Sequence, residues 1–238
     1  VPSMLRQIMR VAGIQEMLGD VRKIAVGGEA LTEDLTRETR TKLPRARLIG
    51  LYGCSEVGTT AALKVIHEIE GGCTSIGLPV PGTKIYVLDE HLRPVPEGEI
   101  GELYVSAAHL SRGYLNSPSM TARRFVADPY SPCAGMRMYG TGDLGKKLPN
   151  GEIAFLGRTD QQVKIRGFRV ELAEVEAALK QVDGIGDAVV VARDLGHGAQ
   201  LIAYIVTAGG EPLMTKRIRQ LLTTRLPEHM IPSLFSSL

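Results

Sequence analysis

The clearest pattern of hydrophobic and polar positions lies in residues 157–176, which read GRTDQQVKIRGFRVELAEVE. Apolar and polar residues alternate over residues 162–166 and again after Gly167, as in a strand with one buried and one solvated face. A glycine between two such runs indicates a turn or a bulge. Apolar residues then recur at spacings of three and four, as on one face of a helix: Leu172, Val175, Leu179 and Val182. The pattern predicts a hairpin followed by a helix.

The first 50 residues predict an alternation of helices and strands. Residues 4–18 carry apolar side chains at near-helical spacing, and residues 21–26 form a short apolar run that ends in two glycines. Thr32, followed by two acidic residues, is a good helix start, and Pro44 marks the end of that helix. A further short strand is expected over residues 47–50.

The remaining segments divide into two kinds. Residues 71–143 are rich in turns and short strands, including 85–88 and 103–105, which predicts a small barrel or a distorted sheet. After the helix that begins at Leu172, the pattern predicts strands over 187–193 and 200–207. A final helix runs from Thr215, its expected cap, to Leu226.

Composition narrows the class of protein. A chain of 238 residues, with 44% hydrophobic and 23% charged residues, is ordinary for a globular protein of one large or two small domains. A net charge of +2, few aromatic residues and no Trp argue against a nucleic-acid or membrane partner. No run has the length of a membrane span. The start is not a signal peptide, and we expect the interior of a longer polypeptide.

The cysteines and histidines show no metal-ligand spacing. Cys54, Cys73 and Cys133 are far apart and odd in number, which indicates free thiols in a reducing cytosol. We interpret each of the five histidines as a surface or structural residue: His67, His91, His109, His197 and His229.

Three loops carry candidate chemistry. In Tyr52-Gly53-Cys54-Ser55-Glu56 the ring can lie against a base, the glycine admits phosphate and the carboxylate can hold Mg²⁺; a simple surface loop is the alternative. Asp143, after a Gly-Thr-Gly turn, can accept hydrogen bonds from two ribose hydroxyls, although such turns are common on surfaces. Gly27-Gly28, after a strand, either admits a closely approaching group or forms a turn without function.

These residues lie within a family resemblance that covers essentially the whole chain. Residues 157–176 closely resemble the hinge-and-hairpin signature of nonribosomal peptide synthetase adenylation domains, which are members of the adenylate-forming superfamily. Residues 52–56 are similar to the superfamily's Tyr-Gly-x-Thr/Ser-Glu loop, with Cys54 in place of the common proline. Residues 101–103, 112–115, 121–129, 139–144 and 226–232 match further landmarks in the correct order. Residues 106–109 depart from the usual glycine-rich segment, and Gly140 stands where the family usually has a basic residue.

The resemblance implies both a fold and a reaction. Residues 1–159 would be the C-terminal part of a large α/β subdomain with a small β-barrel, and residues 160–238 a small mobile α+β lid, with Asp160 as the hinge. An amino-acid carboxylate would attack the α-phosphorus of Mg-ATP, giving an aminoacyl-adenylate and pyrophosphate. A phosphopantetheine thiol on a carrier domain would then take the aminoacyl group. The phosphate loop and the amine-binding aspartate would lie upstream of Val1 and the catalytic lysine beyond Leu238, so we expect the isolated chain to be inactive.

The resemblance also assigns roles to residues. Tyr52 would pack on adenine, Glu56 would hold Mg²⁺, Asp143 would bind the ribose with help from Arg158, and Lys164 would belong to the hinge hairpin. Further nucleotide contacts are expected from Gly28, Glu29, Gly53 and Ser55. The amino-acid pocket would include small or uncharged residues that suggest a neutral substrate side chain: Ala25, Gly27, Leu51, Thr59 and Thr60.

Partners and alternatives follow from the same resemblance. The expected partners are an amino acid, a carrier domain and neighbouring synthetase domains in the cytoplasm. Two alternatives stay open: a fragment of an acyl- or aryl-CoA ligase, and a stand-alone nucleotide-binding or docking module.

Overall fold

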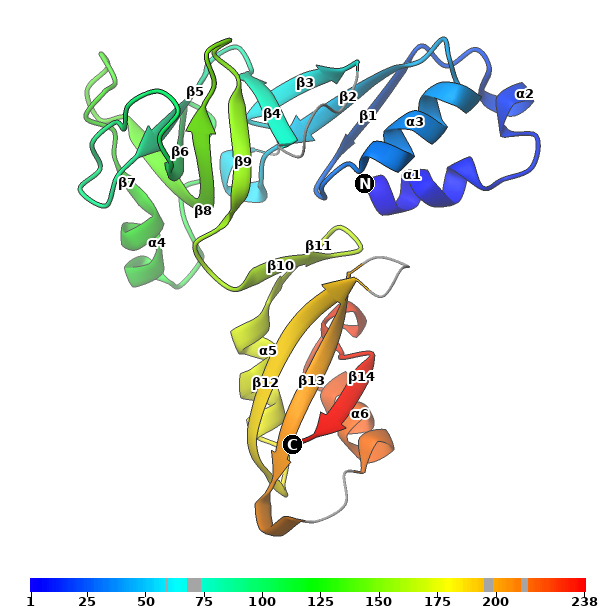
Figure 1. The fold of residues 1–238 in the computed structure, drawn as a ribbon. Helices are drawn as coiled ribbons and strands as arrows, with labels where there is room; N and C mark the ends of the chain where they lie inside the picture. The colour runs from blue at the N-terminus through cyan, green and yellow to red at the C-terminus, as the bar shows by residue number, and fades with distance from the viewer. Residues whose placement is uncertain (59, 68–73, 195–198, 211–213) are drawn as a thin grey trace. The chain divides into compact units, whose positions relative to one another are not determined.

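The computed structural model describes residues 1–58, 60–67, 74–194, 199–210 and 214–238 (Figure 1). The chain divides into two compact units, Val1–Asp160 and Gln161–Leu238, which we call the first and the second unit. Each unit has its own hydrophobic core. Among the described residues, no helix combines the length and the apolar character that a membrane span requires.

The first unit begins with three helices and two parallel strands. The helices are α1 (Pro2–Met9), α2 (Ile14–Leu18) and α3 (Glu33–Lys42), and the strands are β1 (Lys23–Gly27) and β2 (Arg47–Tyr52). Buried side chains of α1 and α3 pack against β1 and β2, with Leu35 and Leu48 almost fully enclosed. The predicted helix start is confirmed, since the Thr32 hydroxyl accepts a hydrogen bond from the Leu35 N–H at 3.4 Å.

The single helix predicted over residues 4–18 is wrong. The helical segment ends after Met9, and Gly13 caps the start of α2 with a φ of 73°. Glycine adopts this left-handed conformation without steric cost, so the backbone changes direction between two short helices. The apolar spacing was right for each helix but could not show the break between them.

The first unit continues as a nine-stranded sheet with the order β1-β2-β3-β4-β9-β8-β6-β5, and β7 also pairs with β8. Of the strand pairs in the part of this sheet that the structure describes, β1 with β2 is the only parallel one, and the others are antiparallel. The added elements are β3 (Ala62–Ile66), β4 (Thr74–Pro79), β5 (Thr83–Leu88), β6 (Gly101–Ala107), β7 (Phe125–Ala127), β8 (Arg137–Lys147), β9 (Ile153–Arg158), a short 3₁₀ turn at Ser55–Val57 and helix α4 (Pro118–Arg124).

The predicted small barrel is not confirmed. Among the described residues, the strand path ends at β1 and at β5, so the sheet stays open. Shifts of register interrupt the pairing of β4 with β9, of β6 with β8 and of β8 with β9. Such bulges bend a sheet and increase its twist without closing it. The distorted sheet, which was the other expectation for this region, is the observed structure.

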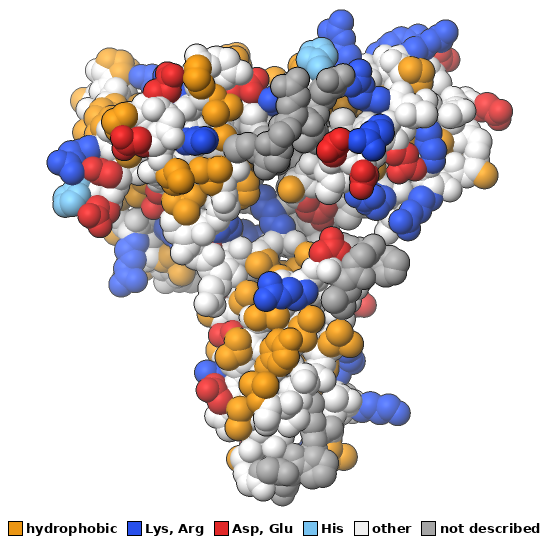
Figure 2. All heavy atoms as spheres, viewed as in Figure 1, with side chains coloured by type: hydrophobic (Ala, Val, Ile, Leu, Met, Phe, Trp, Pro, Cys, Tyr) orange, Lys and Arg blue, Asp and Glu red, His pale blue; other side chains and the backbone are white. Residues whose placement is uncertain are grey.

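In its described residues, the second unit consists of a hairpin, two helices and a three-stranded sheet. Its elements are β10 (Gln162–Ile165), β11 (Phe168–Glu171), α5 (Leu172–Lys180), β12 (Ile185–Asp194), β13 (Ala199–Thr207), a 3₁₀ turn at Ala208–Gly210, α6 (Thr215–Thr223), a 3₁₀ turn at Glu228–Met230 and β14 (Leu234–Ser237). β13 lies between β12 and β14. Helices α5 and α6 supply buried residues to one core with this sheet. On the side seen in Figure 2, hydrophobic side chains gather over this unit, where Val189 and Val206 are exposed.

The predicted hairpin and the helix after it are confirmed. β10 and β11 pair antiparallel, and Arg166 and Gly167 between them have φ values of 51° and 83°. Two successive residues with positive φ are the mark of a type I′ turn, which matches the twist of a two-stranded hairpin. Thr215 is the first residue of α6 and not its cap, because the capping position belongs to Met214.

Candidate functional site

The carboxyl ends of β1 and β2 lie at the same edge of the sheet, because the two strands are parallel and Gly27 is paired with Leu51. A Cβ on Gly27 would lie 2.7 Å from the Leu51 carbonyl oxygen, so the group that approaches this glycine is the neighbouring strand. Gly28 has a φ of 87°, which also favours glycine. Both glycines therefore have a structural reason within the fold.

Three of the five expected pocket residues share one face of this edge. Val26 and Leu48 pack toward α1 and α3. Side chains alternate along a strand, which places Ala25, Gly27 and Leu51 on the opposite face. Thr60 lies near the end of β2, because the N–H of the next residue, Ala61, donates a hydrogen bond to the Tyr52 carbonyl at 2.7 Å. Thr59 lies outside the described residues.

Glu29 has a structural partner in the first helix. Its carboxylate accepts hydrogen bonds from the Ser3 N–H at 2.8 Å and from the Ser3 hydroxyl at 2.9 Å. Ser3 lies in the first turn of α1, where the helix dipole favours a negative charge. The Glu29 carboxylate therefore holds the first turn of α1 in place.

Tyr52 and Asp143, which are 91 residues apart in sequence, meet directly. The Tyr52 hydroxyl donates to Asp143 Oδ2 at 2.5 Å. Burial, followed by the charge of Asp143, raises the pKa of Tyr52 well above its ordinary value. The phenol therefore stays protonated at neutral pH and acts as a hydrogen-bond donor.

Asp143 belongs to a bulge inside strand β8, where a simple turn was expected. Glu102 is paired with Leu144 and Tyr104 with Gly140, so β8 contains two extra residues in this interval. Gly142 has a φ of 74°, and the Asp143 N–H donates to the Thr141 hydroxyl at 3.0 Å. The bulge presents a carboxylate that is only 8% exposed.

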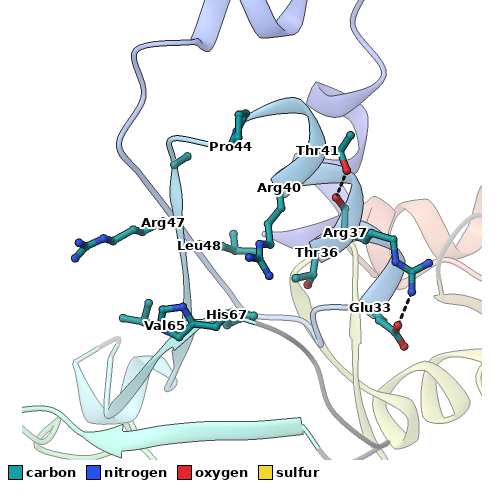
Figure 3. Close-up of a pocket in the computed structure, with 12 residues that line it drawn as sticks. Glu33, Thr36, Arg37, Arg40, Thr41, Pro44, Arg47, Leu48, Val65 and His67 are labelled. Carbon is teal, nitrogen blue, oxygen red and sulfur yellow. Dashed lines mark hydrogen bonds and ion pairs between the residues drawn. The ribbon is translucent and has the colours of Figure 1, made fainter.

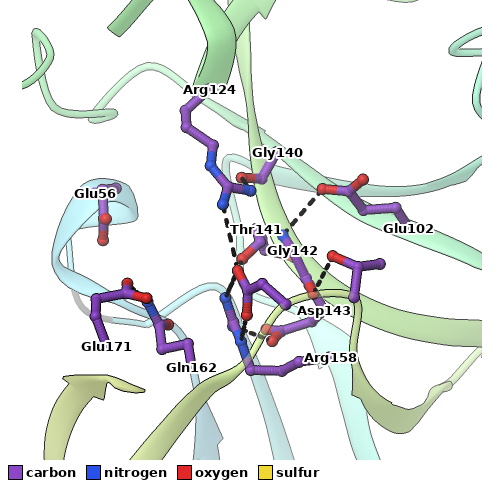
Figure 4. Close-up of polar contacts among 12 residues, drawn as sticks. Glu56, Glu102, Arg124, Gly140, Thr141, Gly142, Asp143, Arg158, Gln162 and Glu171 are labelled. Carbon is purple, nitrogen blue, oxygen red and sulfur yellow. Dashed lines mark hydrogen bonds and ion pairs between the residues drawn. The ribbon is translucent and has the colours of Figure 1, made fainter. Parts of the chain in front are cut away.

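Arg158 links Asp143 to the end of the first unit (Figure 4). One terminal nitrogen of its guanidinium donates to Asp143 Oδ1. The other side of the same group donates to both oxygens of Asp160, with Nε at 2.7 Å and Nη2 at 2.9 Å. Arg124, at the end of α4, adds a contact of 3.3 Å to Asp160. The structure thus brings together three predicted residues, Asp143, Arg158 and Asp160, with Arg124 as an addition.

Glu56 is buried beside two tyrosines. It is 7% exposed, and its Oε1 accepts hydrogen bonds from the Tyr114 hydroxyl at 2.8 Å and the Tyr139 hydroxyl at 2.9 Å. Burial and the charge of Glu56 raise the pKa of the Cys54 thiol to about 12, so this thiol stays neutral. The direction of the Glu56 carboxyl group is set by the two hydroxyl donors.

The single carboxylate of Glu56 suits Mg²⁺ that is bound together with a nucleotide better than a metal ion that is held by protein side chains alone. No cluster of three or more His, Cys, Asp or Glu side chains suited to a metal occurs among the described residues. Mg²⁺ is commonly held by one or two carboxylates together with the phosphates of a bound nucleotide. A single carboxylate such as Glu56 is enough for that arrangement.

The remaining predicted site residues lie in two places. Gly53 connects β2 to the 3₁₀ turn that begins at Ser55, and the Ser55 carbonyl accepts a hydrogen bond from the Ser111 hydroxyl at 3.2 Å. Lys164 belongs to the second unit, where it is exposed on β10 opposite Arg169.

Three contributors to the site were missed by sequence analysis: Arg124, Tyr114 and Tyr139. A tyrosine within an apolar strand needs a partner for its hydroxyl, so Tyr139 carried a signal. Nothing local identified Glu56 as that partner, because the two residues are 83 positions apart.

An open groove of about 750 Å³ lies elsewhere in the first unit, between α3, β2 and β3 (Figure 3). Its lining includes Arg37, Arg40, Arg47 and His67, and Arg37 is paired with Glu33 at 2.5 Å. None of the predicted site residues is part of the lining. This groove is separate from the polar cluster around Asp143.

Comparison with known protein families matches two segments of the chain. The model of the AMP-binding enzymes matches residues 1–115, and the model of the AMP-binding enzyme C-terminal domain matches residues 174–236.

Individual proteins are similar over nearly the whole chain. A probable non-canonical nonribosomal peptide synthetase, CymA of Salinispora arenicola, is 48% identical over 216 residues, which are 91% of this chain and 3% of that protein. The crystal structure of IdnL1 aligns with all of this chain and 49% of its own, at a TM-score of 0.88 and 31% identity. The structure of PA1221, an NRPS protein containing adenylation and PCP domains, aligns with 100% of this chain and 47% of its own, at a TM-score of 0.82 and 27% identity. This chain therefore spans about half of these solved structures and a small part of the synthetase.

Proposed function

This chain belongs to the family of AMP-binding enzymes, and from this premise we propose that it is part of an amino-acid-activating adenylation domain of a nonribosomal peptide synthetase. The domain joins an amino acid to ATP, giving an aminoacyl-adenylate and pyrophosphate, and then transfers the aminoacyl group to a phosphopantetheine thiol on a carrier domain. The 48% identity to a probable nonribosomal peptide synthetase supports the substrate class. The NRPS protein with adenylation and PCP domains supports the carrier as partner.

The observation that carries the proposal is the contact of Asp143 with Tyr52 and Arg158. Tyr52 lies 91 residues before Asp143 and Arg158 lies 15 residues after it, and each of these two partners donates to a different oxygen of the carboxylate. A carboxylate oriented in this way can accept hydrogen bonds from both hydroxyls of a ribose. The ring of Tyr52, held by its hydroxyl, then lies beside the nucleotide as a surface for adenine.

Glu56 is the proposed Mg²⁺ ligand. The metal supplies neutralisation of the charge that develops on the phosphates. Tyr114 and Tyr139 keep the carboxylate oriented, which lowers the reorganisation required when the nucleotide binds. Gly28, Glu29, Gly53 and Ser55 complete the proposed nucleotide contacts.

The substrate and the moving parts complete the proposal. Ala25, Gly27, Leu51, Thr59 and Thr60 line the amino-acid pocket, whose small or uncharged residues suit a neutral side chain. Residues 1–159 are the proposed end of the large subdomain and residues 160–238 the proposed lid, with Asp160 as the hinge between them, although the compact units divide one residue later, after Asp160. Lys164 lies on the hairpin after the hinge. The free thiols of Cys54 and Cys133 are consistent with a cytoplasmic location.

The function is tested by amino-acid-dependent exchange between ATP and pyrophosphate. The assay uses the natural protein that contains this chain, called here the complete protein, because the chain spans about half of the solved structures that it matches. We expect Glu56→Gln, which removes charge and keeps shape, to lower kcat and kcat/KM together by about 100-fold or more.

Glu97→Gln is the matched control, because Glu97 is exposed in a loop of the same unit. We expect it to leave exchange unchanged. If no amino acid stimulates exchange by the wild-type protein, the proposal is wrong. Unchanged exchange in Glu56→Gln would restrict this carboxylate to a structural role.

A further inference from the structure

Asp160 is the last residue of the first unit, and two arginines hold its carboxylate there. Arg158 makes a two-pronged contact, and Arg124 donates to Oδ2 at 3.3 Å. The three side chains are partly buried, with 15% of Arg158, 28% of Asp160 and 33% of Arg124 exposed. The side chain of the residue at the boundary between the two units is therefore held by the first unit.

The two arginines are not equivalent. Arg158 divides its donors between Asp160, Asp143 and the Thr141 carbonyl, so it also belongs to the proposed ribose site. Arg124 reaches Asp160 from α4, on the other side, and its second contact is with the Gly140 carbonyl at 3.5 Å. Arg124 therefore holds Asp160 by a route that does not pass through Asp143.

The backbone of the bulge in β8 leaves space for this cluster. A Cβ on Gly142 would lie 2.9 Å from Arg158 Nη2, 3.0 Å from Asp160 Oδ2 and 3.2 Å from Arg124 Nη1. The Gly142 N–H is fixed by Glu102 at 3.0 Å. The three charged groups thus meet over the one position in the bulge that has no side chain.

We propose that Arg124 is a positioning residue that anchors the carboxylate of Asp160 to the first unit, so that the change of backbone φ and ψ is confined to Asp160. The inference rests on the proposed function, in which the lid rotates between adenylate formation and thiol transfer. Hinges are a few residues that absorb large changes of φ and ψ, and a fixed neighbour defines where that change occurs. Loss of the anchor leaves the first step largely intact and impairs the step that follows the rotation.

The test compares Arg124→Met with Arg123→Met in the complete protein, loaded with its carrier domain. Arg123 is the preceding residue on α4 and is exposed, so its substitution removes the same charge from the same helix. Single-turnover measurements give adenylate formation and carrier loading separately. Because the pair is partly exposed, we expect Arg124→Met to lower carrier loading about threefold relative to adenylate formation. Arg123→Met should leave that ratio unchanged.

A double mutant shows whether Arg124 acts through Asp160. In an Asp160→Asn background, the Arg124→Met substitution should have no further effect on the ratio, because the anchor is already lost. Arg124→Lys keeps a cation within reach of Asp160. It should recover at least half of the carrier loading that Arg124→Met loses. This variant carries the test if Arg124→Met does not fold. Backbone hydrogen exchange at residues 159–161 should be faster in Arg124→Met and unaltered in Arg123→Met.

Equal losses in both steps, or effects that add fully in the double mutant, would overturn the anchoring role while leaving the proposed function intact. A wild-type protein that neither forms an adenylate nor loads a carrier would instead overturn the proposed function, and unaltered hydrogen exchange in Arg124→Met would independently count against the anchor.

Discussion

Gly142 satisfies two requirements at once. Its φ of 74° lies in the left-handed region, and the three charged groups of the Arg124–Asp160–Arg158 cluster occupy the space where a Cβ would project. These atoms are the ends of flexible side chains, so a substitution displaces the cluster more easily than the backbone. The cost of a side chain at this position therefore includes both backbone strain and lost polar contacts.

We expect Gly142→Ala to lower the free energy of unfolding by about 2 kcal/mol in chemical denaturation of the complete protein. Gly98→Ala is the matched control, because Gly98 has a φ of 85° and no atom within 4 Å of the added Cβ. Its expected cost is about 1 kcal/mol, from strain alone. Equal costs for the two variants would mean that the cluster contributes nothing at Gly142.

At the scale of single residues, the sequence predicted the chemistry of the site better than its contacts. Asp143 and Arg158 were expected at the ribose and Tyr52 on adenine, and Asp143 does lie in contact with the other two side chains. The signal came from short motifs in the correct order. Arg124 and Tyr139 were missed because a contact between distant positions leaves no local pattern.

At the scale of elements, two expectations failed for the same reason. The helix over residues 4–18 is broken near Gly13, and the expected Gly-Thr-Gly turn is a bulge within β8. In both places a glycine with positive φ was visible in the sequence only as a residue type. Periodicity identifies an apolar face, but it does not show whether a glycine on that face continues, bends or ends an element.

Glu152 connects two antiparallel strands of the first sheet, β3 and β4. Its Oε2 accepts from Lys64 of β3 at 2.8 Å and from the Ser75 hydroxyl of β4 at 2.7 Å. The hydrogen bond from Lys64 is the main cause that lowers the pKa of Glu152 below its ordinary value of 4.5, and the hydroxyl is the second. Since the folded state favours the carboxylate, this stabilisation is present above the unfolded pKa and is lost as the pH falls through the folded pKa.

We expect Glu152→Gln to lower the free energy of unfolding at pH 7 by about 1 kcal/mol, because the group is largely buried and paired. The difference from wild type should shrink as the pH falls from 4.5 through the lower folded-state pKa of Glu152, below which the group is neutral in both states. Glu99→Gln, at an exposed loop position, should show no such dependence. A difference that stays constant down to pH 3 would contradict an electrostatic origin.

At the scale of the whole molecule, the boundary between the two units falls directly after Asp160. The proposed rotation requires the backbone here to adopt two conformations. Proline fixes φ near about −65° and removes the N–H, so it permits at most one of them. We expect Asp160→Pro to keep most adenylate formation and to abolish most carrier loading in single-turnover assays.

Asp160→Ala separates loss of the carboxylate from loss of backbone freedom. It should impair loading less than the proline variant does, because it leaves φ free. Equal loss of both steps in Asp160→Pro would indicate misfolding or a static linker, and would defeat the hinge assignment.

The central claim, activation of an amino acid for transfer to a carrier thiol, is tested most directly by the mass of the carrier. The complete protein is incubated with Mg-ATP, a mixture of amino acids and a carrier domain bearing phosphopantetheine, with coenzyme A in a parallel reaction. We expect the carrier to gain the mass of one aminoacyl residue, only when ATP is present, and to lose that gain in Glu56→Gln. An unmodified carrier together with a coenzyme A thioester would contradict the claim and identify an acyl- or aryl-CoA ligase.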